Sequence, residues 1–166
     1  MPEFTHVRHK PPVELARPRE IVLACPPMRS NVNLSNMART AGCCGVRKMI
    51  VCGTAKIDAK IARDGAEQVE IEVHRTLAPV LKELKQAGYQ LVGLEQTTGS
   101  ANLHEFAFQR KTALVVGNER SGLDDEVLRL LDHVVEIPVY GLPYSYNVAT
   151  ATAMALYEYC RQFPRG

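Results

Sequence analysis

Short apolar runs alternate along the chain with segments in which apolar residues recur at helical spacing. Runs that are rich in β-branched residues and bounded by turn-forming residues predict strands at residues 21–25, 48–52, 69–73, 90–94, 112–116 and 134–139. Strands that alternate with helix-length connections are typical of an α/β fold with a mainly parallel sheet flanked by helices. The first run begins next to Glu20, so residues 20–166 are predicted to form a single domain.

Helices are predicted where apolar residues return every three or four positions. One covers residues 77–88 and ends at Gly88, because glycine favours the backbone conformation that terminates helices. A second covers residues 124–131 and starts with two acidic side chains at the positive end of the helix dipole. A third covers about residues 146–162, and its predicted core face consists of Val148, Thr152, Ala155, Leu156 and Tyr159.

The last predicted helix carries more apolar side chains than one core-facing stripe needs. Tyr157, Tyr159 and Phe163 add apolar surface to it. Exposed apolar patches of this kind usually mark a partner surface, so the chain is predicted to form a homodimer.

Composition narrows the class of protein. The 166 residues are 46% hydrophobic and 23% charged, which excludes a disordered chain and suits a globular domain. The net charge of +2 is far from the basic balance of a protein that is permanently bound to nucleic acid, so any RNA site has to be a local patch. The apolar runs are far shorter than the roughly 20 residues of a membrane helix, which predicts no membrane span.

Residues 1–19 differ from the rest of the chain because they are rich in proline, arginine and histidine. They are predicted to form a basic N-terminal arm, in which the candidates for contacts with RNA phosphates are Arg8, Lys10, Arg17 and Arg19. A tail without contacts explains the same composition equally well. The arm lacks the apolar stretch of a secretory signal, so we expect a cytoplasmic protein.

The cysteines predict neither a metal site nor a disulfide. The five cysteines form no C-x-x-C pair, and four of them lie inside apolar strand or helix patterns. The full set is Cys25, Cys43, Cys44, Cys52 and Cys160. A thiol in such a pattern behaves as a small hydrophobic side chain. We therefore expect buried structural thiols and no bound metal.

Residues 33–41 form the first stretch that a core-only interpretation does not explain. The apolar face of this predicted helix consists of Leu34, Met37, Ala38 and Ala41, and the opposite face of Asn33, Asn36, Arg39 and Thr40. A solvated surface would account for a polar face, but asparagine is a poor helix former. Amides beside a guanidinium are better suited to holding a phosphate or a ribose.

The second stretch is a buried strand that runs directly into a polar loop at residues 117–122. Ligands of open parallel sheets bind at the carboxyl ends of the strands, and Gly117 would let a backbone approach a ligand closely. A plain turn from strand to helix is the alternative. The presence of Asn118, Glu119 and Arg120 together at one strand end argues for a site.

The third stretch covers residues 136–149. A strand is predicted to end at Pro138, a loop turns at Gly141, and a helix begins with Ser145 as a possible N-cap. The functional alternative is that the Ser145 hydroxyl and the Asn147 amide contact a bound ligand. The sequence contains neither the G-x-S-x-G elbow of hydrolases nor the G-x-G-x-x-G fingerprint of dinucleotide-binding folds.

Taken in this order, the three stretches resemble the motifs of the SpoU/TrmH branch of the SPOUT superfamily of RNA methyltransferases. The matches are Asn33 and Arg39 in the first motif, Gly117, Glu119 and Gly122 in the second, and Ser145 and Asn147 in the third. Any one motif is weakly specific, but the ordered set is strong and covers nearly the whole chain after residue 20. The chain departs from many members at Ser35 and Asn36, where they have Gly-Ala, and at Tyr146, where they have leucine.

The resemblance implies the SPOUT fold, in which the last strand and helix thread a loop to form a C-terminal trefoil knot. It also implies a pocket for S-adenosylmethionine, whose contacts match Leu94, Gly117, Ile137 and Tyr146. Members of the family are homodimers whose active sites draw on both subunits. The implied reaction transfers a methyl group from S-adenosylmethionine to a ribose 2'-hydroxyl of RNA, without a metal.

The resemblance assigns the chemistry to five residues, which are Asn33, Arg39, Glu119, Ser145 and Asn147. Family proposals make the residue matching Arg39 the base that removes the hydroxyl proton. A guanidinium holds its proton firmly, so a contact with the neighbouring phosphate that polarises the nucleophile is the alternative. Glu119, Ser145 and Asn147 are assigned to shaping the site and orienting the cofactor or the ribose.

The RNA substrate and two other functions stay open at this stage. Small members of this branch act mostly on tRNA, so the resemblance favours tRNA over ribosomal RNA. A non-catalytic RNA-binding module with the same fold is the alternative function, against which the presence of all five motif residues argues. A flavodoxin-like nucleotide binder would need a phosphate-binding loop, which the sequence does not show.

Overall fold

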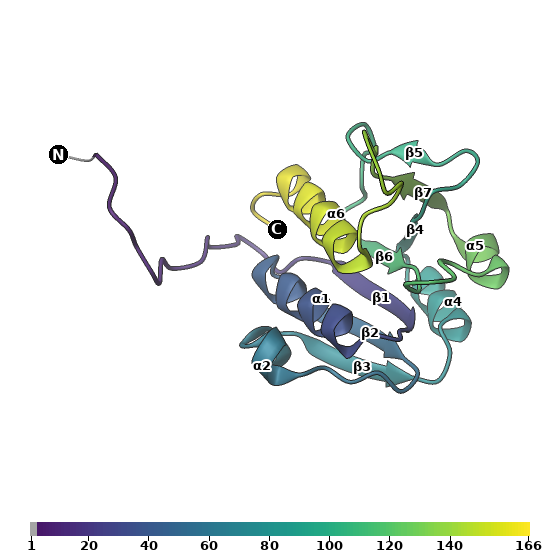
Figure 1. The fold of residues 1–166 in the computed structure, drawn as a ribbon, viewed down its shortest axis with the longest axis horizontal. Helices are drawn as coiled ribbons and strands as arrows, with labels where there is room; N and C mark the ends of the chain where they lie inside the picture. Colours follow the sequence, from purple (N-terminus) through teal and green to yellow (C-terminus); the bar gives the residue numbers. More distant parts are fainter. Residues whose placement is uncertain (1–2) are drawn as a thin grey trace.

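The computed structural model describes residues 3–166 and shows one parallel sheet between two layers of helices (Figure 1). Seven strands are hydrogen-bonded in the order β3-β2-β1-β6-β4-β7-β5, and all the paired neighbours run parallel. This arrangement confirms the predicted α/β class with a mainly parallel sheet. The C-terminal knot stays a prediction.

The strands follow the predicted runs closely. Their bounds are β1 (Ile21–Pro27), β2 (Lys48–Cys52), β3 (Glu70–His74), β4 (Gln90–Leu94), β5 (Ala101–Asn102), β6 (Thr112–Val116) and β7 (His133–Glu136). β2, β4 and β6 coincide with predicted strands at both ends. The predicted strand at residues 134–139 is wrong at its end, since Pro138 has no backbone N–H with which to continue the ladder.

The helices are α1 (Asn31–Cys43), α2 (Ala59–Ala62), α3 (Gly65–Gln68), α4 (Ala78–Gln86), α5 (Asp125–Leu130) and α6 (Val148–Gln162). The predicted stop of the helix at Gly88 is confirmed, because Gly88 adopts a φ of +88° just beyond α4. α2 and α3 have four residues each, which is too few for periodicity to reveal them. Within residues 3–166, no helix is long and apolar enough to cross a membrane.

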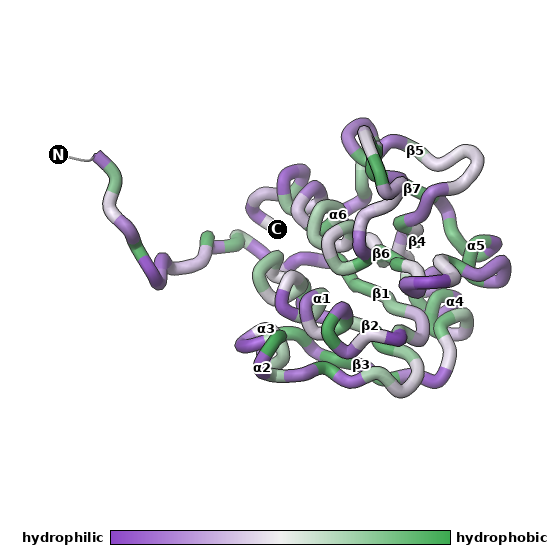
Figure 2. Tube along the Cα trace, in the orientation of Figure 1, coloured by the Kyte–Doolittle hydropathy of each residue, from purple (hydrophilic) through white to green (hydrophobic). Residues whose placement is uncertain are grey.

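Alternate residues of each strand supply two separate cores. On β1, Ile21 and Leu23 pack in the layer of α1 and α6, whereas Val22 and Ala24 pack in the layer of α4 and α5. Hydrophobic positions therefore gather along the central strands (Figure 2). The predicted apolar face of α1 is confirmed, because its four residues are fully buried: Leu34, Met37, Ala38 and Ala41.

The last helix corrects the argument from its aromatic residues. The predicted core face of α6 is confirmed at four positions, and Val148 is half-buried. Tyr159 is fully buried and adds no partner surface, whereas Phe163 is half-buried and packs against the core. Tyr157 alone of the three is exposed, at 73%.

The N-terminal arm divides into two parts with different surroundings. Residues 3–14 extend away from the domain and are exposed (Figure 1). Arg17 and Arg19 instead contact the end of the chain: Arg17 Nε donates to Gly166 O at 3.1 Å, and Arg19 Nη1 donates to Phe163 O at 2.5 Å. Residues 1–2 of the predicted arm lie outside the described residues.

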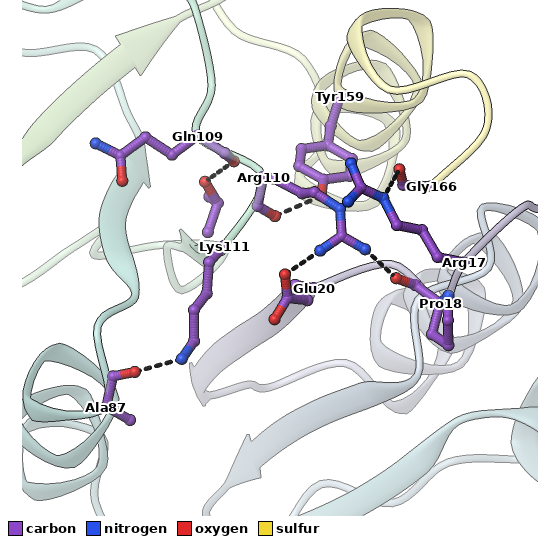
Figure 3. Close-up of polar contacts among 10 residues, drawn as sticks. Arg17, Pro18, Glu20, Ala87, Gln109, Arg110, Lys111, Tyr159 and Gly166 are labelled. Atoms are coloured by element: carbon purple, nitrogen blue, oxygen red, sulfur yellow. Dashed lines mark hydrogen bonds and ion pairs between the residues drawn. The ribbon is translucent and has the colours of Figure 1, made fainter.

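Arg110 holds the same segment from the sheet side (Figure 3). Its guanidinium donates to the Pro18 carbonyl at 2.6 Å and pairs with the Glu20 carboxylate, while the Tyr159 hydroxyl donates to the Arg110 carbonyl at 2.6 Å. Arg19 is only 8% exposed. The expectation that Arg17 and Arg19 contact phosphates is therefore wrong for Arg19, because its guanidinium is used inside the domain.

Candidate active site

A cavity of about 430 Å³ lies at the carboxyl ends of β4, β6 and β7, which are neighbours in the sheet. Each of these strands leads into a segment that lines it, and the loop before α6 closes the remaining side. Ligand sites of open parallel sheets occur at this edge. The volume falls within the roughly 300–1,000 Å³ of pockets that bind small molecules.

The loop after β6 folds back on itself and needs glycine at two positions. Asn118 and Gly122 exchange backbone hydrogen bonds of 3.0 Å, and Gly122 has a φ of +66°. A Cβ on Gly117 would lie 2.9 Å from the Cα of Gly122. The absence of a side chain at Gly117 therefore lets the backbone of Gly122 approach closely. Gly117 also lines the cavity, where we expected it to let a ligand approach.

Glu119 joins this loop to the start of α1. Its carboxylate accepts the backbone N–H of Arg29 at 3.0 Å, the backbone N–H of Ser30 at 2.9 Å and Asn33 Nδ2 at 3.4 Å. Ser30 is itself the N-cap of α1, since its side chain accepts the Asn33 backbone N–H. Glu119 thus positions the N-terminus of α1 against the carboxyl end of β6.

Electrostatics keep Glu119 ionised. Partial burial by itself would raise its pKa, but the backbone N–H groups of Arg29 and Ser30 and the Asn33 amide outweigh burial and lower the pKa below the ordinary value of 4.5. The carboxylate is therefore a weak base with its oxygens already occupied. A positioning role fits it better than proton transfer.

Glu119→Gln should lower the free energy of unfolding at pH 7 by about 1–2 kcal/mol, because the backbone donors of Arg29 and Ser30 lose an ionised acceptor. Since folding lowers the pKa of Glu119, its stabilising effect is present above pH 4.5 and is lost as the pH falls through the lower folded value. Urea unfolding between pH 7 and pH 3 should show a smaller acid loss in the variant than in the wild type. Glu105→Gln, at an exposed position, is the control, and equal acid losses in Glu119→Gln and wild type would contradict the assignment.

Asn33 and Asn147 connect the first and third motifs directly. Asn147 Nδ2 donates to Asn33 Oδ1 at 3.1 Å, so Glu119, Asn33 and Asn147 form one hydrogen-bonded chain. Asn147 Oδ1 accepts the backbone N–H groups of Ala149 and Thr150 and is the N-cap of α6. The prediction of Ser145 as the N-cap is therefore wrong, because the helix begins two residues later than that position requires. Ser145 is exposed and lines the cavity.

All four residues predicted to contact the cofactor line this cavity: Leu94, Gly117, Ile137 and Tyr146. Sequence reasoning missed Glu95 and Gln96, which also line it. Glu95 Oε2 accepts the Leu123 backbone N–H at 3.2 Å and so braces the loop after β6. Their position directly after a buried strand is the same signal that identified Glu119, and it was available in the sequence.

Arg39 lies apart from the cavity. It is exposed and lines a groove of about 740 Å³ between α1 and α6, which we call the α1–α6 groove; Cys43, Met154 and Tyr157 also line it. Asn147 lines both the groove and the cavity. The structure thus brings Asn33, Glu119 and Asn147 into contact, whereas Arg39 faces the neighbouring groove.

The cysteines divide by burial. Cys25 and Cys52 are buried, which confirms the expectation for these two, and Cys43 is exposed, which contradicts it. Cys44 and Cys160 are half-buried, and all five thiols are free. In residues 3–166 no three His, Cys, Asp or Glu side chains form a group that could hold a metal ion.

Comparison with protein families matches residues 20–157 to the SpoU rRNA Methylase family. The chain is 31% identical over 150 residues to the tRNA (guanosine(18)-2'-O)-methyltransferase of Aquifex aeolicus (strain VF5), with 88% of this chain and 71% of that protein covered. It is 30% identical over 133 residues to the enzyme of the same name from Escherichia coli (strain K12), with 78% of this chain covered. The chain spans only 58% of the length of that second relative.

Solved structures show the same likeness. The crystal structure of the Aquifex aeolicus TrmH/SpoU tRNA modifying enzyme superposes with a TM-score of 0.83 at 31% identity, covering 89% of this chain and 77% of that one. The AdoMet-bound rRNA methyltransferase from Sinorhizobium meliloti gives a TM-score of 0.73 at 25% identity, covering 89% of this chain and 58% of that one.

Proposed function

We propose that this chain, which belongs to the SpoU rRNA Methylase family, transfers a methyl group from S-adenosylmethionine to a ribose 2'-hydroxyl of RNA. The observation that carries the proposal is the hydrogen-bonded chain of Glu119, Asn33 and Asn147, which joins all three sequence motifs beside one cavity. The names of the relatives and of the solved structures support the same reaction.

The cavity residues fit S-adenosylmethionine. Leu94, Ile137 and Tyr146 offer apolar surface for a flat heterocycle. The carboxylates of Glu95, Glu119 and Glu136 also line the cavity, and negative charge of this kind favours a cationic ligand. We propose that these residues hold the cofactor, with the loop at Gly117 forming one wall.

When bound, the cofactor supplies an electrophilic methyl group on a sulfonium. The task of the protein is then to place the ribose oxygen in line with that carbon, and positioning of this kind supplies several kcal/mol. Held by these residues, the cofactor would supply the methyl group to the ribose oxygen and would leave as a neutral thioether, while the hydroxyl proton would pass to water. The side-chain NH2 groups of Asn33 and Asn147 each donate one hydrogen bond within residues 3–166. The second N–H of each group is available to orient the ribose.

Arg39 is proposed to hold the phosphate next to the target ribose and to polarise the hydroxyl. Its exposed guanidinium in the α1–α6 groove suits a phosphodiester, to which it can donate two parallel hydrogen bonds. Asn147 lies between this groove and the cavity, so a nucleotide can contact both. Ser145, exposed at the cavity, is proposed to orient the cofactor or the ribose.

The experiment that tests the proposed function has two stages. Calorimetry with S-adenosylmethionine should show binding, and a methyl-labelled cofactor with total RNA should label a 2'-O-methylated nucleoside recovered by digestion. We expect the label in tRNA rather than ribosomal RNA, as in the relatives named above. Cofactor binding without labelled RNA would favour the non-catalytic module.

The arm is proposed to contact RNA phosphates through Arg8 and Lys10, which are exposed. Deleting residues 1–14 should weaken RNA binding and reduce the slope of log affinity against log salt by roughly 0.7–0.9 for each phosphate that the arm neutralises in the full chain. Cofactor affinity should not change. This deletion keeps Arg17 and Arg19, whose hydrogen bonds belong to the domain. An unchanged slope across a salt series would show that the arm contacts no RNA.

We also propose a homodimer that forms through the exposed apolar side chains of α6, which leaves Arg39 on α1 open to RNA. Tyr157 is 73% exposed and Met154 is 37% exposed, and both line the groove. Because Arg39 faces the same groove, dimerisation would add residues of the second copy to the site. Sedimentation at micromolar concentration should show a dimer, and Tyr157→Asp should shift it to monomer because a carboxylate would be buried in an apolar contact. A wild-type monomer would remove the proposal.

A further inference from the structure

Two exposed tyrosines are sequence neighbours of residues that line the cavity, and they take no part in the core. Tyr140 is 88% exposed and Tyr144 is 75% exposed, and we call these two side chains the aromatic rim. Both lie in the loop between β7 and α6, in which Val139 and Ser145 line the cavity. Exposure leaves both rings free to contact a partner, and their burial against one would be stabilising.

The backbone of the aromatic rim is conformationally strained at Tyr144. Tyr144 has a φ of +83°, in a region that glycine adopts freely and a bulky residue adopts with strain. The loop is anchored there, since Gln96 Nε2 donates to Tyr144 O at 3.1 Å. A turn alone would be formed more easily with glycine. The position therefore supplies a ring, and strained residues of this kind cluster at ligand sites.

We propose that the aromatic rim stacks on unpaired bases of the RNA, at the nucleotide whose ribose enters the cavity and at its neighbour. The inference rests on the proposed methyl transfer, because that reaction brings a ribose to the cavity mouth. Tyr140 and Tyr144 are bonded to Val139 and Ser145, which line the cavity, so bases at or next to that ribose are the ones within reach of the rim. Single-stranded RNA is bound in this way, with unstacked bases on tyrosine rings.

Neighbouring charges favour RNA over a protein partner. Arg120 is exposed and lines the cavity, and Arg39 is exposed in the α1–α6 groove across Asn147. Exposed rings together with a guanidinium in the cavity and another in the groove suit a polyanion whose bases have apolar faces, whereas the cavity carboxylates of Glu95, Glu119 and Glu136 are assigned to the cationic cofactor. A protein seated on the rim would also close the cavity mouth against the ribose. The substrate is therefore a loop or other single-stranded segment rather than a duplex.

The test compares Tyr140→Leu, Tyr144→Leu and the double variant with wild type. Leucine keeps an apolar side chain and, at position 144, the same backbone strain, but it cannot stack. The KM for unfractionated tRNA and the Kd for a fluorescent oligoadenylate of about twelve nucleotides should each rise about 5- to 100-fold, the loss typical of one stacked base. Cofactor affinity, measured by calorimetry, should stay at the wild-type value. Phenylalanine at either position should recover the RNA affinity that leucine loses.

Val73→Ala is the matched control, because Val73 is an exposed apolar residue on the edge strand β3. Oligoadenylate annealed to oligouridylate should bind more weakly than the single strand, and the leucine variants should not weaken it further. Unchanged KM and Kd in the double variant would overturn the proposal. A double variant that sediments as a monomer but keeps the wild-type RNA affinity would also overturn it, because the rim would then contact a second copy of the chain and not RNA. If wild type binds oligoadenylate through the rim but transfers no methyl group, the proposed function fails and the stacking stands.

Discussion

Arg39→Ala should reduce methyl transfer by at least about 100-fold, the loss that follows removal of one group stabilising charge in a transition state. The side chain is exposed on α1 and lies in the α1–α6 groove, so its removal leaves the core intact. Cofactor affinity and the sedimentation coefficient should therefore stay near wild type. Single-turnover assays at saturating RNA and cofactor measure the chemical step directly.

Arg39→Lys separates charge from geometry. Lysine keeps the positive charge but loses the planar fork that can hold a phosphate and a hydroxyl together, so this variant should be nearly as inactive as alanine. Arg129→Ala is the control, since Arg129 is an exposed arginine on α5 in the opposite layer. Full activity of Arg39→Ala would make the residue part of a solvated helix face and remove it from the mechanism.

Gly117→Ala should reduce methyl transfer by about 100-fold and weaken cofactor binding, because the added Cβ would lie 2.9 Å from the Gly122 backbone. Backbone cannot yield as a flexible side chain can, so the loop after β6 has to move, and a shift of about 1 Å in a site costs that much. Glu119 and its hydrogen bonds to α1 would move with the loop. A single-turnover methyl-transfer assay and calorimetry with S-adenosylmethionine measure the two effects, and a thermal unfolding scan checks that the variant stays folded.

Gly141→Ala is the matched control for that experiment. Gly141 lies in the other loop near the cavity, and a Cβ there would meet no atom within 4 Å. Its variant should bind the cofactor and unfold as the wild type does. Wild-type affinity in Gly117→Ala would show that the loop is free to adjust, and the role assigned to its tight turn would be wrong.

The sequence predicted the sheet well because strands buried on both faces appear as uninterrupted apolar runs. β2, β4 and β6 are of this kind, and their predicted and observed bounds agree. β5 escaped prediction because two residues carry no period, and it exists only through pairing with β7. The prediction from the aromatic residues of α6 failed for a related reason. Tyr159 packs against Phe108, which lies far from it in the sequence, and a local pattern cannot show such a contact.

The candidate site was predictable as a set of residues but not as a geometry. Polar residues at strand ends identified Glu119, and the motif order identified Asn33 and Asn147. The sequence did not show that the Glu119 carboxylate accepts the backbone N–H groups of Arg29 and Ser30. These hydrogen bonds depend on the positions in space at which β1 and β6 end. The separation of Arg39 into a neighbouring groove depends on the packing of α1 against α6, which no local pattern encodes.

Asn147 is a wall shared by the cavity at the strand ends and the α1–α6 groove. Its amide caps α6, binds Asn33 on α1 and faces both the cavity at the strand ends and the α1–α6 groove. A ligand that turns this side chain on one side changes what the other side presents. Occupancy of the two would in that case be thermodynamically linked, and the linkage would be reciprocal: whatever factor RNA applied to cofactor affinity, the cofactor would apply to RNA affinity.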